Sequence, residues 1–258
     1  MNNTDAGSAI EFRKVGYRLA DGRELLHDLY LDVTRGETLV LLGRSGSGKT
    51  TTLKLINCLL SPSSGDISVE GRFIRDWDVI QLRRKIGYVI QDVGLFPHFT
   101  VARNIGLVPS LEKWTADRIK ARVQELLQLV GLDANIAVRY PHQLSGGQRQ
   151  RVGVARALAA DPPFLLMDEP FGALDPITRA ELQREFLSLQ RRMGKTIVFV
   201  THDLREALLL GTRIGLMESG CLVTIESREK FSQSSHPLVK AYLDAFNTTF
   251  DHQAGENR

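Results

Sequence analysis

Cysteine is nearly missing from this sequence. Cys58 and Cys221 are the only two in 258 residues, and neither lies at metal-ligand spacing from another thiol or a histidine. A disulfide scaffold is thereby excluded, and we interpret both thiols as incidental, buried apolar side chains of a protein in a reducing compartment. Long apolar runs are missing as well, because the stretches 39–42, 164–167 and 197–200 are far too short to span a membrane.

A strong charge of either sign and a leader sequence are also lacking. The chain carries 33 Lys and Arg and 30 Asp and Glu, a formal net charge of +3, so composition alone does not indicate a nucleic-acid partner. Residues 1–8 are polar and lack the basic start and apolar stretch of a secretory signal. With 43% hydrophobic and 24% charged residues, the composition is that of a globular protein, which we expect to be soluble and cytoplasmic.

Short apolar runs alternate with helical patterns, which is typical of an α/β protein with a largely parallel sheet. The expected strands are 38–42, 85–90, 164–168 and 196–201, followed by a hairpin of 213–217 and 221–225. A helix is expected from about Lys49 to Leu60, directly after a glycine-rich turn.

Strand signals disappear between residues 101 and 160. Apolar residues recur there at spacings of three and four, which predicts an amphipathic helix that packs one face inward. These residues are Ile119, Val123, Leu126, Leu127 and Val130. The segment contains nine Lys or Arg and four Asp or Glu, and we interpret it as the solvated surface of a helical insert. Residues 247–258 are polar, and we expect them to be frayed.

The segment 43–50, Gly-Arg-Ser-Gly-Ser-Gly-Lys-Thr, fits the pattern G-x-x-x-x-G-K-[ST], with a predicted strand before it and a predicted helix after it. Its glycines allow the backbone to curl so that successive N–H groups point at a phosphate, and the helix adds the positive end of its dipole. Lys49 can reach the β- and γ-phosphates of a nucleotide, and the Thr50 hydroxyl can bind Mg²⁺. The flanking elements disfavour the alternative, an ordinary surface turn.

A pair of acids follows the predicted strand 164–168, whose last residue is Asp168 and which is followed by Glu169. Ligands of open α/β sheets bind at the carboxyl ends of strands. Asp168 is suited to hold Mg²⁺ through water, and Glu169 to orient or deprotonate the water that attacks a γ-phosphate. Alone, such a pair indicates a solvated turn; beside a phosphate loop it indicates the metal and water end of a nucleotide site.

Residues 144–148, Leu-Ser-Gly-Gly-Gln, precede a helix-forming run. Ser145 can cap this helix, with Gly146 and Gly147 exposing its amides to an anion. The motif resembles the signature of the ATP-binding cassette (ABC) ATPases, and further landmarks of that family occur in the family's order.

Three landmarks carry this resemblance along the chain. Gln91 matches the glutamine loop, Ala173-Leu174-Asp175 matches the loop after the acidic strand, and His202 matches the switch histidine. The resemblance runs from about Ile10 to Ser232, nearly the whole chain. It implies an α/β P-loop NTPase, with a RecA-like core, an antiparallel β subdomain and an inserted α-helical subdomain.

The resemblance also implies domain bounds and a working assembly. Residues 1–258 would form a single ABC ATPase domain, with the helical insert at approximately 93–157 and a short helical tail at approximately 227–258. Two identical chains would form a head-to-tail homodimer, so that each signature motif contacts the γ-phosphate bound by the other chain. His202 would hold the γ-phosphate and the attacking water, and Gln91 would sense Mg²⁺ and couple the site to a transmembrane partner.

The candidate site therefore combines catalytic, nucleotide-binding and metal-binding residues for ATP and Mg²⁺. The catalytic candidates are Glu169, His202, Lys49 and Gln91. The nucleotide-binding candidates are Gly43, Arg44, Ser45, Gly46, Ser47, Gly48, Lys49, Thr50, Thr51, Ser145, Gly146, Gly147, Gln148 and Asp175. The metal-binding candidates are Thr50, Gln91 and Asp168.

One family landmark departs from its pattern. The family usually stacks adenine on an aromatic residue four positions after a valine of the first strand, and counting from Val15 that position is Leu19. Tyr17 shares its strand face and could serve instead, or it could be part of the core. The sequence leaves both readings open.

A narrower resemblance concerns the transported solute. The stretches 82–91, 94–98 and 170–179 look like those of ATPase subunits of bacterial quaternary-amine importers, which take up glycine betaine, choline, carnitine or proline as osmoprotectants. Many such subunits carry two regulatory CBS modules; this sequence ends at Arg258, and we expect neither these modules nor the sensing of ionic strength through them. The solute assignment rests on association alone, since none of these residues can touch the solute.

The expected partners are a second ATPase subunit, membrane permease subunits at the surface 91–101 and, indirectly, a solute-binding protein. Such a subunit would lie peripherally on the cytoplasmic face of the inner membrane. Importers of other small solutes remain alternatives, and no residue separates import from export. The basic segment 101–160 supports a further alternative, an ABC ATPase acting on nucleic acid, although members that act in DNA repair usually have long coiled-coil insertions and those of translation usually have two cassettes.

Overall fold

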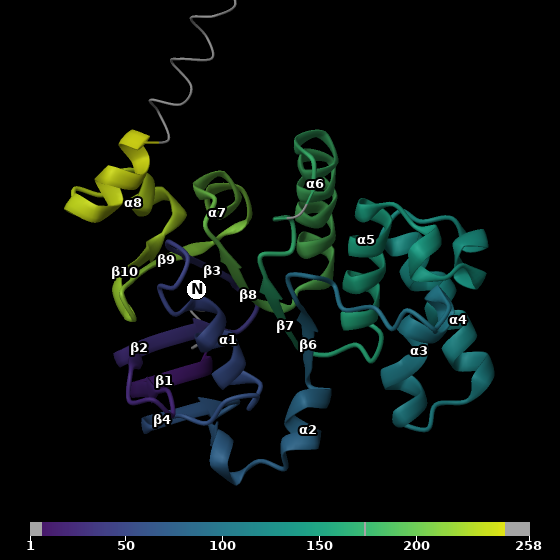
Figure 1. Ribbon diagram of the computed structural model, residues 1–258, viewed down its shortest axis with the longest axis horizontal. Helices are drawn as coiled ribbons and strands as arrows, with labels where there is room; N and C mark the ends of the chain where they lie inside the picture. The colour runs from purple at the N-terminus through teal and green to yellow at the C-terminus, as the bar shows by residue number, and fades with distance from the viewer. Residues whose placement is uncertain (1–6, 173, 246–258) are drawn as a thin grey trace, which may run out of the picture.

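The structure is a computed structural model that describes residues 7–172 and 174–245, and it contains two sheets surrounded by helices (Figure 1). The central sheet is formed by β3 (Thr38–Leu42), β6 (Ile86–Val89), β7 (Phe164–Asp168), β8 (Thr196–Thr201), β9 (Arg213–Glu218) and β10 (Cys221–Ser227). Its strand order is β10-β9-β3-β8-β7-β6, and only the β9–β10 hairpin is antiparallel. The α/β class is therefore confirmed, and the strands predicted for this sheet lie where the sequence indicates.

Both faces of the central sheet are covered, which explains why its strands read as unbroken apolar runs. In β3, Leu39 and Leu41 belong to a core shared with the smaller sheet, whereas Val40 and Leu42 belong to the core on the helical side. Strands β7 and β8 alternate in the same way. Because β3, β8, β7 and β6 run parallel, their carboxyl ends meet at one edge, where polar residues can leave the core.

The smaller sheet is antiparallel, with the order β2-β1-β4-β5. It consists of β1 (Ser8–Arg18), β2 (Glu24–Thr34), β4 (Ser64–Val69) and β5 (Arg72–Phe73), and it is followed by α2 (Val79–Arg84). The register between β1 and β2 shifts at several points, for example between Phe12 and Val15. Such shifts interrupt the strict alternation by which a strand is found in sequence, so these bounds could not be predicted individually.

The segment between β6 and β7 is helical, as the lack of strand signals predicts. It contains α3 (Val101–Leu111), α4 (Ala116–Leu129) and α5 (Gly146–Ala157), with short 3₁₀ turns at 134–138 and 141–143. The apolar stripe of α4 is buried at Val123, Leu126 and Leu127. In Figure 1 these helices lie beside the central sheet, on the side away from β1, β2 and β4.

The remaining helices follow the acidic strand. They are α6 (Pro176–Met193), α7 (Leu204–Leu210) and α8 (Arg228–Ser232), and the chain is helical again at 237–245. Ala173 of the predicted family loop and the tail 247–258 lie outside the described residues. In the part of the chain that the structure describes, no helix combines the length and hydropathy needed to cross a bilayer.

Two local expectations are wrong. The helix after the glycine-rich turn, α1 (Lys49–Ile56), ends before Leu60, because Asn57 caps it and Cys58 takes a φ of 55°, outside the helical region. The thiols are not both buried: Cys58 is half-buried, and Cys221 is exposed. Cys221 begins β10, an edge strand whose residues are at most half-buried.

Buried Asn104 in α3 anchors the loop 96–100, which follows Gln91 in the chain. Its Oδ1 accepts a hydrogen bond from the Phe96 amide at 2.8 Å, and its Nδ2 lies 3.1 Å from each of three loop carbonyls.

We expect Asn104→Ala to lower the free energy of unfolding by about 2 kcal/mol, because buried backbone groups of the loop 96–100 lose their partners. Urea denaturation measures the change. Lys120→Ala, on the exposed side of α4, should change it by less than about 0.5 kcal/mol, and equal losses in both variants would contradict this anchoring.

Candidate functional site

The glycine-rich segment 43–50 forms the turn between β3 and α1. Gly46 and Gly48 have φ values of 80° and 103°, a region that glycine adopts without strain. A Cβ atom at Gly43 would lie 2.3 Å from the Met217 carbonyl oxygen, so a side chain is excluded there. The N-terminus of α1, the positive end of its dipole, therefore meets a closely packed loop at the carboxyl edge of the sheet.

Lys49 is the first residue of α1 and is only 4% exposed. Its ammonium donates hydrogen bonds to the carbonyl oxygens of Gly43 and Arg44, each at 2.8 Å. Burial lowers the pKa of Lys49, and the negative charges of Glu169 and Asp168 oppose that shift. The loop thus folds around a cation whose hydrogen bonds, within the described residues, go to backbone oxygens. Phosphate oxygens can replace such contacts.

Thr50 and Asp168 join the loop to the end of β7. The Thr50 hydroxyl donates to Asp168 Oδ1 at 2.8 Å, and the Tyr88 hydroxyl, from β6, makes a long contact of 3.4 Å with Oδ2. Burial raises the pKa of Asp168, the charge of Glu169 adds to the rise, and the two hydroxyls oppose it. The pKa of Tyr88 is also raised, first by burial and then by the Asp168 charge, so Tyr88 stays a donor.

Glu169 and His202 form a pair at the carboxyl ends of β7 and β8. Glu169 Oε2 and His202 Nδ1 are 3.0 Å apart. Because an ionised carboxylate can only accept, Nδ1 carries the proton of this pair. Glu169 has a φ of 44°, and such left-handed geometry costs a non-glycine residue about 1–2 kcal/mol. Its amide donates to the Val200 carbonyl at 3.0 Å, which holds this conformation in place.

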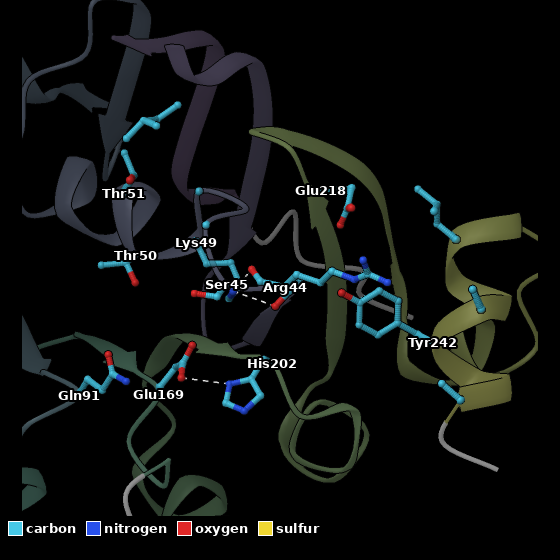
Figure 2. Close-up of a pocket in the computed structure, with 17 residues that line it drawn as sticks. Arg44, Ser45, Lys49, Thr50, Thr51, Gln91, Glu169, His202, Glu218 and Tyr242 are labelled. Atoms are coloured by element: carbon cyan, nitrogen blue, oxygen red, sulfur yellow. Dashed lines mark hydrogen bonds and ion pairs between the residues drawn. The ribbon is translucent and has the colours of Figure 1, made fainter. Parts of the chain in front are cut away.

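These groups open into one pocket of about 920 Å³, shown in Figure 2. Most of the loop residues predicted from the sequence line it together with the predicted catalytic residues: Gly43, Arg44, Ser45, Gly46, Gly48, Lys49, Thr50, Thr51, Gln91, Glu169 and His202. In Figure 2 Gln91 and His202 lie on either side of Glu169. Asp168 does not line the pocket and reaches it through Thr50. Four segments far apart in sequence therefore converge on one cavity.

Other predicted residues lie away from the pocket. Ser47 is buried behind the loop, and its hydroxyl has no hydrogen-bond partner among the described residues. Ser145 caps α5, accepting from the Gln148 amide at 3.2 Å, while Gln148 Oε1 accepts from the Ser145 amide at 3.0 Å. Gly146 and Gly147 form the first turn of that helix, and Asp175 caps α6 by accepting from the Thr178 amide at 3.0 Å. Within one chain, the residues from the two helix starts, Ser145 to Gln148 and Asp175, do not line the pocket of the phosphate loop.

The sequence analysis missed part of the pocket lining. The missed residues are Leu25 of β2, Glu218 of β9, and Leu238, Ala241, Tyr242 and Ala245 of the segment 237–245. No motif marks them, although the apolar spacing of the last four could have indicated a helix face. Neither Tyr17 nor Leu19 lines the pocket, and Tyr17 packs against the core between the two sheets.

Comparison with known proteins gives a family and named relatives. The family described as ABC transporter matches residues 26–172. The chain is 55% identical over 235 residues to the glycine betaine/carnitine/choline transport ATP-binding protein OpuCA of Bacillus subtilis, which covers 91% of this chain and 62% of the relative. It is also 55% identical to the glycine betaine uptake system ATP-binding protein YehX of Escherichia coli, covering 83% of this chain and 69% of that protein. The chain thus spans about three fifths of the length of OpuCA.

Solved structures agree with this similarity. The ATP-binding cassette MJ0796, a dimer in a post-hydrolysis state bound to ADP and Pi, has a TM-score of 0.76 and 34% identity, covering 85% of this chain and 98% of that one. The protein cbiO1 from Clostridium perfringens, part of the ABC transporter complex cbiONQ, has a TM-score of 0.81 and 27% identity, covering 95% and 99%. The fold is therefore that of an ATP-binding cassette.

The buried carboxylate of Asp168 leads to a pH-dependent prediction. The raised pKa of Asp168 means that its ionised form destabilises the ligand-free fold, and this effect disappears as the pH falls below the range where Asp protonates in an unfolded chain. We therefore expect Asp168→Asn to raise the Tm of the ligand-free protein at pH 8, with a difference that shrinks toward pH 4. Differential scanning calorimetry across this range measures it.

Asp175→Asn is the matched control, because the pKa of exposed Asp175 is lowered by the Thr178 amide and its ionised form stabilises the fold. This variant should not raise the Tm at pH 8. If the Tm gain of Asp168→Asn instead grew toward low pH, the destabilisation of the ligand-free fold could not come from the buried charge of Asp168.

Proposed function

This chain belongs to the ABC transporter family of ATP-binding proteins, and on that basis we propose that it is the ATP-hydrolysing subunit of an importer for quaternary-amine osmoprotectants such as glycine betaine, choline or carnitine. The observation that carries the proposal is the convergence of the phosphate loop with the Glu169–His202 pair in one pocket. The similarity to OpuCA, a glycine betaine/carnitine/choline transport protein, and to YehX, a glycine betaine uptake protein, supports the solute class.

ATP binding follows from the loop. The β- and γ-phosphates would bind at the Lys49 ammonium and the start of α1. Phosphate oxygens would then replace the carbonyls of Gly43 and Arg44 as hydrogen-bond partners of Lys49. Ser45, Gly46 and Thr51 line the same pocket and would complete the phosphate contacts.

The residues at the end of β7 fit Mg²⁺. The ion prefers oxygen ligands and keeps several waters, and Thr50 Oγ1 and Asp168 Oδ1 present two oxygens 2.8 Å apart. Within residues 7–172 and 174–245 no group of three or more His, Cys, Asp or Glu is placed to hold a metal, so the nucleotide phosphates would supply further ligands. Thr50 would bind the ion directly, Asp168 through water, and Gln91 from the pocket wall. When bound, Mg²⁺ neutralises charge on the β- and γ-phosphates.

Hydrolysis is assigned to Glu169 and His202. Glu169 would orient or deprotonate the attacking water, and the hydrogen bond from His202 Nδ1 fixes the direction of its carboxylate. The second histidine nitrogen, Nε2, would donate to a γ-phosphate oxygen when it carries a proton as well, because both ring nitrogens are donors only in the imidazolium form. Phosphoryl transfer depends mainly on such positioning and on charge neutralisation, which is what these residues supply.

A head-to-tail homodimer would complete the site. Ser145 and Gly146 are exposed at the N-terminus of α5, away from the pocket of their own chain. In the dimer they, with Gly147, Gln148 and Asp175, would face the nucleotide bound by the other chain. MJ0796, a similar cassette, is dimeric in its post-hydrolysis state, which supports this arrangement. The dimer would lie on the cytoplasmic face of the inner membrane, contact permease subunits near Gln91 and act indirectly with a solute-binding protein.

The basic helical segment gives little support to the nucleic-acid alternative, because several of its arginines are used within the fold. Arg151 bonds to Glu185 and to the Val130 carbonyl. Arg122 donates to the carbonyls at the end of α5, and Arg156 donates to the loop after Gln91. These arginines are engaged in contacts within the fold. The excess of basic over acidic residues in the segment 101–160 therefore overstates the positive charge that is accessible to a nucleic-acid backbone.

The role of Glu169 is tested by Glu169→Gln. This variant should retain ATP and hydrolyse it at least about a hundredfold more slowly, since one well-placed catalytic group contributes about 3 kcal/mol. It should accumulate as an ATP-bound dimer, detected by size-exclusion chromatography with light scattering. Glu181→Gln, at an exposed position of α6, should hydrolyse ATP like the wild type. Wild-type turnover in Glu169→Gln would remove Glu169 from its role.

The solute class is tested by uptake. In cells that lack their own osmoprotectant importers, this chain expressed with its permease and solute-binding protein should drive the accumulation of radiolabelled glycine betaine, choline or carnitine. The Lys49→Ala variant should abolish it, because the phosphate loop loses its cation. Absence of uptake for all three solutes, with ATPase activity retained, would contradict the solute assignment and leave the family membership intact.

A further inference from the structure

One wall of the nucleotide pocket is formed by a single helix face near the end of the described chain. Leu238, Ala241, Tyr242 and Ala245 line the pocket, and their spacing of three, four and seven residues places them on one side of the helical segment 237–245. Leu238 is 40% exposed, so part of this apolar face is turned to the cavity rather than into the core. A solvated phosphate site does not need such a wall.

Leu25 supplies an apolar side chain from the smaller sheet to the same pocket. The pocket lining therefore combines the polar loop around Lys49 with aliphatic side chains and one aromatic ring. A ligand that matches both kinds of lining has a polyphosphate at one end and a flat, weakly polar group at the other. Nucleotides have this form.

Tyr242 is the aromatic residue of this lining. Figure 2 shows its ring projecting from the C-terminal segment, with the hydroxyl toward Arg44 of the phosphate loop and Glu218 nearby. The hydroxyl is enclosed beside Arg44, and it has no well-formed hydrogen bond to any residue that the structure describes. Burial, followed by the charge of Glu218, raises the pKa of Tyr242, so the phenol stays neutral and keeps its donor. A buried donor without a partner, on the rim of a ligand pocket, is a group that a ligand can satisfy.

We propose that Tyr242 forms the nucleobase end of the pocket, so that the base of the bound nucleotide is held by the C-terminal segment rather than by the first strand. The inference rests on the proposed ATP-binding function. It gives the base an aromatic partner on a chain whose Tyr17 packs against the core and does not line the pocket. Because every base has a π-face, such a contact strengthens binding with limited selectivity among bases.

The test compares Tyr242→Leu with Tyr17→Leu, two identical side-chain changes at the two candidate aromatics. Isothermal titration calorimetry with ADP and with inorganic pyrophosphate, both with Mg²⁺, separates base contacts from phosphate contacts without hydrolysis. Tyr242→Leu should weaken ADP binding about tenfold, or about 1.4 kcal/mol, and leave pyrophosphate binding unchanged. Tyr17→Leu should leave both affinities unchanged, and Tyr242→Phe, which keeps the ring and loses only the hydroxyl donor, should weaken ADP binding less than Tyr242→Leu does.

A Tyr242→Trp variant gives a second readout that does not depend on a loss of affinity. Trp77 and Trp114, the two natural tryptophans, lie outside the pocket lining. ADP should quench the fluorescence of the new indole by stacking, and pyrophosphate should not.

Three results would overturn the inference: unchanged ADP affinity in Tyr242→Leu, equal weakening of ADP and pyrophosphate, or tighter ADP binding, which would identify the segment as an obstruction. In each of these cases the wild type still binds ADP and the proposed function stands. A wild-type chain that binds neither ligand would instead refute the proposed function itself.

Discussion

The site depends on the burial of one ammonium group at the edge of a parallel sheet. Lys49 is almost withdrawn from water, yet its direct partners are two backbone carbonyls of its own loop. Carbonyl dipoles compensate a buried cation only in part, and the acids at the end of β7 supply the opposing charge from beyond hydrogen-bond distance. Electrostatic attraction therefore holds the loop, the start of α1 and the end of β7 together. An anionic ligand in contact with Lys49 would compensate its charge more fully.

This arrangement follows from the way the sheet is covered. Alternate residues of β3, β7 and β8 enter two different cores, so neither face of these strands can carry a polar side chain. Charged residues are confined to the strand ends, and the parallel direction brings those ends to one edge. Glu169 and His202 are far apart in sequence, and they meet because β7 and β8 are neighbours in the sheet. Asp168, the last residue of β7, lies at the same edge.

Local patterns predicted much of this arrangement. The bounds of β3, β7 and β8 could be read directly, because a strand buried on both faces is a continuous apolar run that polar residues delimit. The phosphate loop could be predicted because glycine, lysine and threonine act there within eight consecutive positions. The smaller sheet was harder, since register shifts in β1 break its alternation, and the exposure of Cys221 depends on an edge position that composition does not reveal. Tyr242 and Leu25 were not predicted as pocket residues, because no motif marks them and tertiary packing brings them to the pocket from segments far apart in sequence.

A single chain encloses the two ends of the pocket to different extents. Around Arg44, the C-terminal segment adds a wall that the core fold alone does not supply. At the other end the His202 side chain is 60% exposed, although its hydrogen bond to Glu169 is already formed. Water there screens the charges that would act on a γ-phosphate, and electrostatic catalysis is strong only when bulk water is excluded. The exposed N-terminus of α5 does not line the pocket of its own chain and so does not exclude that water, which is the physical reason for including a second chain in the proposed function.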